Sequence, residues 1–282
     1  MATWTQSNFN KIKLAGYDLD GTLYNQRLRV SPANLQAVRA WAAAGRLTAI
    51  CSGRMIPRVS ALLRDELGVS GYKMCLNGAL VYDQQDRLLA AKPINARTIK
   101  AAFTIAKRYG VQIRFYTELT HAFYKPGQRS TYYGGDLTCD VNFATQAELR
   151  DMLNHPGLHF YKFTLEAAYG NVPALMLALR AMRRLPLNMT RSKMLLYEGL
   201  APGVDKLFGM RVIAKDAGIE LADCMCFGDQ LNDLTMIQGV GYGVAMRNAV
   251  PRVRRVAAYV APSNWNDGVA RTLNTVLRQS PK

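Results

Sequence analysis

Acidic residues gather at two places in this 282-residue chain where a strand is expected to end. Asp18 and Asp20 follow one apolar run, and Asp229 and Asp233 follow another. Carboxylates brought close together repel one another unless a cation joins them. A ligand set made only of oxygen suits Mg²⁺, which keeps bound waters and accepts substrate phosphate. The pattern therefore favours a magnesium site that could also bind a substrate phosphate group.

Three further segments have the chemistry to bind an anion. Ser52-Gly53-Arg54 offers a hydroxyl and backbone amides near a helix start, which suit a phosphate group. Asn77 follows the next expected strand, and Lys206 lies beside the start of a later helix. Each signal is common by itself, because an exposed charge often has only a surface role. Their significance depends on whether the fold brings them together.

The elements around these residues predict such a meeting. Apolar runs at 11–17, 47–51 and 73–76 are expected strands, separated by helices at 32–44 and 57–67. Ser31-Pro32 supplies an N-cap and a first-position proline for the earlier of these helices. The β-α-β-α-β order is typical of a doubly wound parallel sheet, in which ligands bind beyond the carboxyl ends of the strands. All the singled-out residues lie at such ends.

The middle of the chain interrupts this order. A hairpin is expected at 80–91, and helices and strands from about 94 to 193 do not continue the parallel pattern. The pattern resumes with a helix at 206–217 and strands at 225–227, 242–245 and 258–260. We therefore expect an α/β protein. Residues 1–92 and 194–282 would form a Rossmann-like core, and 93–193 an inserted α/β domain.

Composition narrows the class of protein and its location. Hydrophobic residues make up 49% of the chain and charged residues 20%, which is ordinary for a folded globular protein. No apolar stretch approaches the ~20 residues of a membrane span, and the polar N-terminus has no signal-peptide core. Five cysteines without a CxxC spacing suit free thiols in a reducing compartment. We expect a cytoplasmic protein with buried thiols at Cys224 and Cys226.

The net charge is unusual. Lys and Arg number 36 against 20 Asp and Glu, giving +16, which attracts nucleic acid, acidic membranes or phosphorylated small molecules. The excess is spread along the chain and forms no basic tail. Its densest runs, at 180–184 and 252–255, have a helix-like spacing that is typical of a solvated face. We expect a small phosphorylated substrate as partner and no membrane, and nucleic acid is the remote alternative.

The chemistry-bearing segments resemble a known family. Asp18-Leu-Asp-Gly-Thr22, Ser52, Lys206 and the run 228–233 are similar, in order, to the four motifs of the haloacid dehalogenase superfamily. More narrowly, the chain resembles the Cof-like phosphatases, in which a large α/β cap of type IIB lies between the second and third motifs. The resemblance covers nearly all of the core, whereas the cap matches mainly in length and rhythm. Ser52 stands where the family often has Thr, and Leu207 where it often has Gly; neither change removes a polar group that the motifs require.

The resemblance implies a role for each residue. Asp18 would be the nucleophile that forms an aspartyl-phosphate, and Asp20 the general acid and then the general base. Lys206 would neutralise the transferring phosphoryl group and pair with Asp18. Ser52 and the Gly53 amide would bind phosphoryl oxygens.

The resemblance also implies a ligand set for Mg²⁺. A carboxylate oxygen of Asp18, the backbone carbonyl of Asp20 and Asp229 would hold the metal, and Asp233 would bind a metal-bound water or support the ligands. Asn77 and Asn232 would contact substrate or phosphate. Arg54 remains open between a site role and a structural one.

The function implied is that of a Mg²⁺-dependent phosphatase of small phosphorylated metabolites, with sugar phosphates as the first expectation. The cap would close over the core, exclude water and select the leaving group. Residues such as Arg114 and Tyr116 could take part in that selection. An alternative is a phosphotransferase or phosphomutase on the same scaffold, in which a sugar hydroxyl captures the phosphoenzyme. We expect a monomer.

Overall fold

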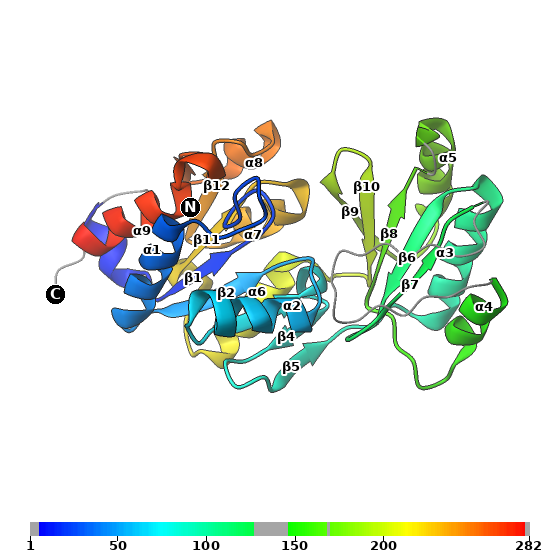
Figure 1. Cartoon of the computed structure of the whole chain (residues 1–282), viewed down its shortest axis with the longest axis horizontal. Coiled ribbons are helices and arrows are strands. Elements are labelled where there is room, and N and C mark those ends of the chain that lie inside the picture. Colours follow the sequence, from blue (N-terminus) through cyan, green and yellow to red (C-terminus); the bar gives the residue numbers. More distant parts are fainter. Residues whose placement is uncertain (1–5, 127–145, 168–169, 280–282) are drawn as a thin grey trace. The chain divides into compact units, whose positions relative to one another are not determined.

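The computed structural model describes residues 6–126, 146–167 and 170–279 (Figure 1). The chain divides into two compact units, the first formed by 1–90 and 205–282 and the second by 91–204. Among the described residues, no helix is both long and apolar enough to span a membrane. Each unit has its own sheet.

The first unit is built on an eight-stranded sheet with the strand order β13-β12-β11-β1-β2-β3-β4-β5. The central strand β1 pairs in parallel with β2 on one side and with β11 on the other, and β3 pairs antiparallel with β4. This arrangement confirms the α/β class with a Rossmann-like core. The strands are β1 (Leu14–Tyr17), β2 (Leu47–Cys51), β3 (Tyr72–Cys75), β4 (Leu80–Tyr82), β5 (Leu88–Ala91), β11 (Cys224–Gly228), β12 (Tyr242–Met246) and β13 (Tyr259–Ala261).

Helices pack on this sheet in two groups (Figure 1). Helix α1 packs against α9, and α7 packs against α6 and α8. Strand order runs from β1 toward β3 on one side and from β11 toward β13 on the other, so the order reverses between β1 and β11. A doubly wound sheet has its ligand crevice at this reversal, beyond the carboxyl ends of the strands. The helices are α1 (Pro32–Ala43), α2 (Ile56–Ala61), α6 (Lys206–Asp216), α7 (Leu234–Gly239), α8 (Pro251–Val256) and α9 (Gly268–Gln279).

The second unit contains a five-stranded antiparallel sheet with the order β7-β6-β8-β10-β9. Helix α3 contacts β6 and α5, and helix α4 contacts β7. The strands are β6 (Gln112–Tyr116), β7 (His121–Tyr124), β8 (Lys162–Glu166), β9 (Asn188–Lys193) and β10 (Leu196–Leu200). The helices are α3 (Ala96–Tyr109), α4 (Gln146–Asn154) and α5 (Val172–Met182).

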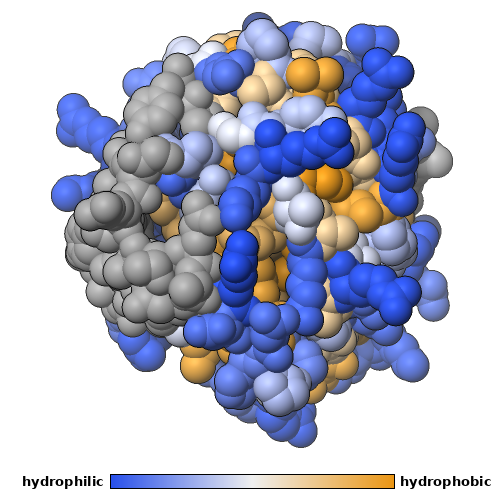
Figure 2. Space-filling model, turned by 90° about the vertical axis from the view of Figure 1, so that its right-hand side faces the viewer, coloured by the Kyte–Doolittle hydropathy of each residue, from blue (hydrophilic) through white to orange (hydrophobic). Residues whose placement is uncertain are grey.

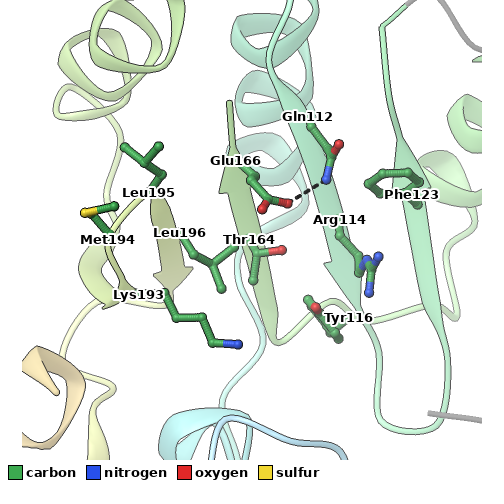
Figure 3. Close-up of a pocket in the computed structure, with 10 residues that line it drawn as sticks. All are labelled: Gln112, Arg114, Tyr116, Phe123, Thr164, Glu166, Lys193, Met194, Leu195 and Leu196. Atoms are coloured by element: carbon green, nitrogen blue, oxygen red, sulfur yellow. Dashed lines mark hydrogen bonds between the residues drawn. The ribbon is translucent and has the colours of Figure 1, made fainter. Parts of the chain in front are cut away.

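The two faces of this second sheet differ, as strand periodicity requires. Ile113 and Phe115 of β6 are fully buried, and Phe115 meets Phe103 of α3 with 6.3 Å between ring centroids. Arg114 and Tyr116 alternate with them and point to the opposite face. There they help to line a pocket of about 380 Å³ (Figure 3). The pocket is also lined by Gln112, Phe123, Thr164, Glu166 and residues 193–196.

The boundary between the units differs from the one expected from the sequence. Residues from 194 onward were expected to belong to the core, but β10 pairs antiparallel with β8 and β9. Residues up to Val204 therefore fall in the second unit, and the first unit resumes at Asp205. The apolar pattern of a strand does not reveal which sheet it joins, because strands of both sheets are apolar: β1 and β11 of the first sheet are buried throughout, and so are four of the five residues of β8 in the second.

Two helices lie near the C-terminal end. The basic run at 252–255, which has a helix-like spacing, lies in the six-residue helix α8. Helix α9 follows Asp267, whose φ of 52° ends the preceding turn. At the other end, residues 11–13 precede β1, and a short helix, η1 (Gln6–Lys11), takes the first part of the expected strand.

One face of the second unit carries many hydrophilic side chains (Figure 2). Figure 2 shows the helical side of the second unit, where hydrophilic side chains are distributed with hydrophobic ones between them. Cys224 and Cys226 are buried and free, as predicted, and so are Cys51 and Cys75; Cys139 lies outside the described residues.

Candidate active site

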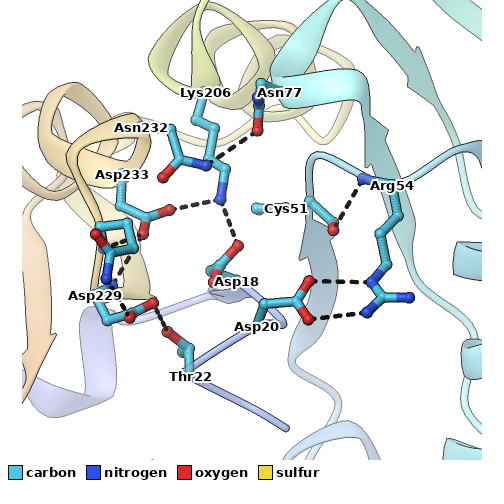
Figure 4. Close-up of polar contacts among 12 residues, drawn as sticks. Asp18, Asp20, Thr22, Cys51, Arg54, Asn77, Lys206, Asp229, Asn232 and Asp233 are labelled. Carbon is cyan, nitrogen blue, oxygen red and sulfur yellow. Dashed lines mark hydrogen bonds and ion pairs between the residues drawn. The ribbon is translucent and has the colours of Figure 1, made fainter. Parts of the chain in front are cut away.

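Three carboxylates and one ammonium group meet at the carboxyl ends of β1 and β11 (Figure 4). Asp18 directly follows β1, Asp229 directly follows β11, and Asp233 ends the short helix η6 (Leu231–Asp233). Each offers a carboxylate oxygen within 4.8 Å of the others. All three are buried, and Lys206, the first residue of α6, has no exposed surface.

Lys206 joins two of these carboxylates. Its Nζ donates to Asp18 Oδ1 at 2.6 Å and to Asp233 Oδ1 at 2.5 Å. The helix start is fixed locally, because the Asp205 carboxylate caps α6 by accepting the Phe208 N–H at 2.8 Å. Burial acts to lower the pKa of Lys206, but Asp18 and Asp233 outweigh it and raise that pKa above its ordinary value. The ammonium group therefore stays charged.

The loop after β11 is held by its own carboxylate. Asp233 Oδ2 accepts the backbone N–H groups of Asp229 and Gln230, both at 2.9 Å. Gly228 makes this closure possible, since a Cβ there would lie 2.5 Å from the Cβ of Asp233. Gly21 plays the same part in the loop after β1: its φ is +89°, and an added Cβ would collide with the Asp229 carboxylate. Glycine at these positions lets the two acidic loops approach.

The charge balance of the cluster favours a cation. Burial, followed by the charge of Asp233, raises the pKa of Asp18 well above its ordinary value and that of Asp229 to about 7. One ammonium group cannot balance three ionised carboxylates, and buried uncompensated charge is costly. Clustered carboxylate oxygens are the donors that a hard divalent cation prefers. Asp18, Asp229 and Asp233 therefore fit a bound divalent metal.

Neighbouring polar groups orient the acidic loops. Thr22 Oγ1 donates to Asp229 Oδ1 at 3.2 Å, and Gln230 Nε2 donates to Asp229 Oδ2 at 3.3 Å. Asn248 Nδ2 donates to the carbonyl of Gly21 at 2.8 Å, and Asn248 Oδ1 accepts the Asn264 N–H at 3.1 Å. The sequence reasoning assigned no site role to Asn248 or Asn264. The only signal for them was that the segments 243–249 and 263–269 resemble the family.

The residues expected to bind phosphate lie together on the other side of the cluster. Ser52 follows β2 and is 1% exposed, and its carbonyl accepts the Asn77 N–H at 2.9 Å. Asn77 adopts a left-handed conformation with φ 58°, and its Oδ1 accepts from Asn232 Nδ2 at 3.2 Å. Among the described residues, Asn232 Oδ1 is buried without a hydrogen-bond partner. Gly53 lies in the turn between Ser52 and Arg54.

Asp20 is placed differently from the other acidic residues. Its side chain is 38% exposed, and the three-carboxylate cluster does not include it. Both of its oxygens accept hydrogen bonds from Arg54: Nε donates to Oδ2 at 3.1 Å and Nη2 to Oδ1 at 2.8 Å (Figure 4). The structure thus places Asp20 outside the buried cluster, in a polar and partly solvated setting.

Comparison with known proteins identifies the family. Residues 16–273 match the haloacid dehalogenase-like hydrolase family. The chain belongs to this family. The hydrolase is therefore an enzyme, and the matched segment includes all of the site residues described above.

Several relatives of this hydrolase are named as phosphatases. It is 25% identical to the 5-amino-6-(5-phospho-D-ribitylamino)uracil phosphatase YcsE of Bacillus subtilis, over 93% of this chain and 94% of the relative. It is 26% identical to an HMP-PP phosphatase of Serratia proteamaculans, over 86% of each chain.

Solved structures share the fold. A haloacid dehalogenase-like hydrolase from B. subtilis superposes with a TM-score of 0.81 at 23% identity, covering 93% of this chain and 99% of the other. A sugar phosphatase of haloacid dehalogenase subclass IIB superposes with a TM-score of 0.76 at 22% identity, covering 93% and 98%.

Proposed function

We propose that this hydrolase is a Mg²⁺-dependent phosphatase that acts on small phosphorylated metabolites through an aspartyl-phosphate. The observation that carries the proposal is the buried Asp18 carboxylate, paired with Lys206 and grouped with Asp229 and Asp233 at the reversal of the sheet. Phosphoryl transfer requires a nucleophile, a fixed positive charge and a set of metal ligands close to one another.

Asp18 would attack phosphorus. Its backbone is anchored on both sides, because its N–H donates to Phe227 at 3.1 Å and its carbonyl accepts the Leu23 N–H at 3.2 Å. The carboxylate is therefore held in place before the substrate arrives. A bond would form from its oxygen to phosphorus as the ester bond to the leaving oxygen breaks, which divides the hydrolysis into two easier displacements.

Asp20 would move the proton in both steps. It would first donate a proton to the leaving oxygen and then accept one from the water that hydrolyses the aspartyl-phosphate, which regenerates the acid. The products are the free alcohol and inorganic phosphate. The position of Asp20, two residues beyond the nucleophile and partly open to solvent, supports this role.

Other groups would bind the phosphoryl oxygens. The Ser52 hydroxyl and the Gly53 amide would donate hydrogen bonds, and the Lys206 ammonium group would offset the negative charge that the transferring group carries. Asn77 and Asn232 would contact the substrate. The buried Asn232 Oδ1, which has no partner among the described side chains and backbone groups, supports this assignment because a substrate hydroxyl could donate to it.

The carboxylates of Asp18 and Asp229 and the backbone carbonyl of Asp20 would hold Mg²⁺, with Asp233 supporting them directly or through water. When bound, Mg²⁺ supplies the charge neutralisation that allows an anionic carboxylate to approach an anionic phosphate. The clustering of the acidic oxygens within 4.8 Å supports this ligand set.

Sugar phosphates are the proposed substrate class. The phosphatases that resemble this chain include one named for a ribityl phosphate. The pocket on the second unit presents hydrogen-bonding groups of Gln112, Arg114, Thr164 and Glu166, which suit a polyhydroxylated molecule. We assign substrate selection to this unit. The buried free cysteines support a reducing, cytoplasmic location.

The test is release of inorganic phosphate from a panel of phosphorylated metabolites, with and without Mg²⁺, by the wild type and by Asp18→Asn. Metal-dependent release that is lost in the variant is the expected result, and the ranking of the panel would narrow the substrate. A phosphorylated Asp18 without phosphate release would point to a phosphotransferase. Undiminished activity of Asp18→Asn would refute the nucleophile.

A further inference from the structure

Arg54 binds Asp20 in a geometry that determines the orientation of the carboxylate. Two N–H groups of one guanidinium meet the two oxygens of one carboxylate at 3.1 and 2.8 Å. Such paired contacts fix the plane of the carboxylate as well as its position. The Asp20 side chain is 38% exposed, so packing does not enclose it. The two Arg54 contacts define one orientation of the carboxylate.

Arg54 is itself held at several points. Its guanidinium lies over the ring of Tyr24, 5.4 Å from the centroid, and its backbone N–H donates to Ser52 Oγ at 3.2 Å. The Arg54 carbonyl accepts the Leu76 N–H at 3.0 Å. Tyr24 is completely buried, so the ring is a fixed support. The arginine therefore has both ends anchored, and the carboxylate it binds is held against a rigid part of the first unit.

We infer that Arg54 is a positioning residue for Asp20, and that it acts on proton transfer through this carboxylate without binding the phosphate. The inference rests on the proposed function. A general acid acts only within hydrogen-bond reach of the atom it protonates, so holding the Asp20 carboxylate in one orientation raises the fraction of productive complexes.

The fork leaves room for the proton. A carboxylate has about four lone-pair sites on its two oxygens. Arg54 uses one site on each oxygen, so its two contacts do not by themselves exclude a proton from the carboxyl group. After the transfer, the guanidinium faces the carboxylate that remains, which then takes a proton from the attacking water. The proton count is thus the same before and after a turnover.

The competing interpretation is that Arg54 binds substrate phosphate directly, because it follows the Ser52-Gly53 turn. A double-variant cycle separates the two. Arg54→Met should lower kcat for a hexose phosphate at least about tenfold, a part of the ~10²–10⁴ that general acid–base catalysis supplies, and should change KM little. In an Asp20→Asn background the same substitution should cost less than about twofold. Equal losses in both backgrounds, or no loss in the wild type, would overturn the inference.

The leaving group provides a second readout. In a single-turnover experiment, Arg54→Met should slow phosphoenzyme formation from a hexose phosphate much more than from p-nitrophenyl phosphate, because nitrophenolate departs without a proton. An equal slowing for both substrates would contradict a role in proton delivery.

Arg58→Met is the matched control. Arg58 lies over the same ring, 5.8 Å from its centroid, and donates to the Tyr24 hydroxyl at 3.0 Å, but its ion pair is with Glu66. It should change kcat by less than about twofold and leave the leaving-group dependence unchanged.

Crystal structures of the two variants test the positioning of Asp20 separately from the proposed function. Asp20 should lose its single orientation in Arg54→Met and keep it in Arg58→Met, whether or not the enzyme releases phosphate. An unchanged Asp20 in Arg54→Met would refute positioning. Failure of the wild type to show Asp18-dependent phosphate release would refute the proposed function alone.

Discussion

Replacing Lys206 by Met should destabilise the first unit strongly. The Lys206 ammonium group is fully buried and is the cation that ion-pairs with both Asp18 and Asp233, at 2.6 and 2.5 Å. Methionine has a similar length but no charge. The substitution would leave two buried carboxylates without this counter-charge.

The structure supports a loss of about 3–5 kcal/mol, the usual cost of removing one partner of a buried ion pair. The loss should depend on pH. Burial already raises the pKa of Asp18, so without the lysine the folded protein must keep a proton on Asp18 that the unfolded chain releases above pH ~4. A folded state that binds more protons than the unfolded state loses stability as pH rises. The difference between wild type and variant should therefore be smaller near pH 5 and larger near pH 8.

Urea denaturation followed by tryptophan fluorescence measures this effect. Of the three tryptophans, Trp41 and Trp265 are described and belong to the first unit, and Trp41 is completely buried. Titrations near pH 5 and near pH 8, each with EDTA or with Mg²⁺, would separate the charge effect from lost packing. Mg²⁺ should recover part of the stability near pH 8, because it supplies positive charge to the same carboxylates.

Lys73→Met is the matched control. Lys73 is also buried, at 4% exposure, but its charged partner Asp86 has a side chain that is 62% exposed and can be hydrated once the lysine is gone. This variant should lose stability without any response to Mg²⁺. A loss below about 1 kcal/mol in Lys206→Met, or one that changes neither with pH nor with Mg²⁺, would refute the reasoning that the two buried carboxylates depend on this charge.

Four further outcomes are expected. Burial and the charge of Asp233 raise the pKa of Asp229 to about 7, so a proton competes with the metal for this carboxylate. The Mg²⁺ affinity measured by calorimetry should therefore rise roughly tenfold per pH unit up to about pH 7 and then level off. Gly21→Ala should cost about 1–3 kcal/mol in thermal unfolding, because φ is +89° and the new Cβ would meet Asp229. Thr22→Val should weaken Mg²⁺ binding about tenfold, because it removes a hydrogen bond to Asp229. Added salt should raise KM for an anionic substrate more than it lowers kcat, because the net charge is +16.

Each of these outcomes has a control or a contrary result. Gly45→Ala is the control for Gly21→Ala: Gly45 also has a positive φ, +74°, but nothing lies within 4 Å of an added Cβ, so equal losses in both variants would exclude the collision with Asp229. An Mg²⁺ affinity that does not change between about pH 5 and pH 8 would mean that no proton is displaced. Wild-type affinity in Thr22→Val would remove Thr22 from the support of the metal site. A salt effect confined to kcat would argue against steering of the substrate.

Much of the fold could be predicted from local patterns. Strand β2 spans Leu47–Cys51 as expected, and α1 begins at Pro32, where Ser31 Oγ accepts the Asn34 N–H at 3.1 Å. Apolar runs and caps act within a few residues, so the sequence carries them directly. The partner of β10 could not be predicted in this way, because its inclusion in the second sheet depends on pairing with β8 and β9.

The positions of the candidate site residues could also be predicted, since Asp18, Ser52, Asn77 and Asp229 each follow a strand. Their support could not. Nothing near Asp229 in the sequence indicates that Thr22 donates to it, or that Asn248 holds the Gly21 carbonyl, because these contacts join segments more than two hundred residues apart. Such pairs form only where packed strands and loops bring their backbones together.

The sequence by itself determined the α/β class, the residue types available at the strand ends and the resemblance to a family of hydrolases. Only the tertiary structure decided how those residues combine. It showed Lys206 bound to Asp18, 188 positions away, and to Asp233, and it showed Arg54 directed at Asp20 over the ring of Tyr24. The sequence specifies the type of each side chain. Which charges surround it, and at what distance, depends on which buried segments the fold brings to the same edge of a sheet.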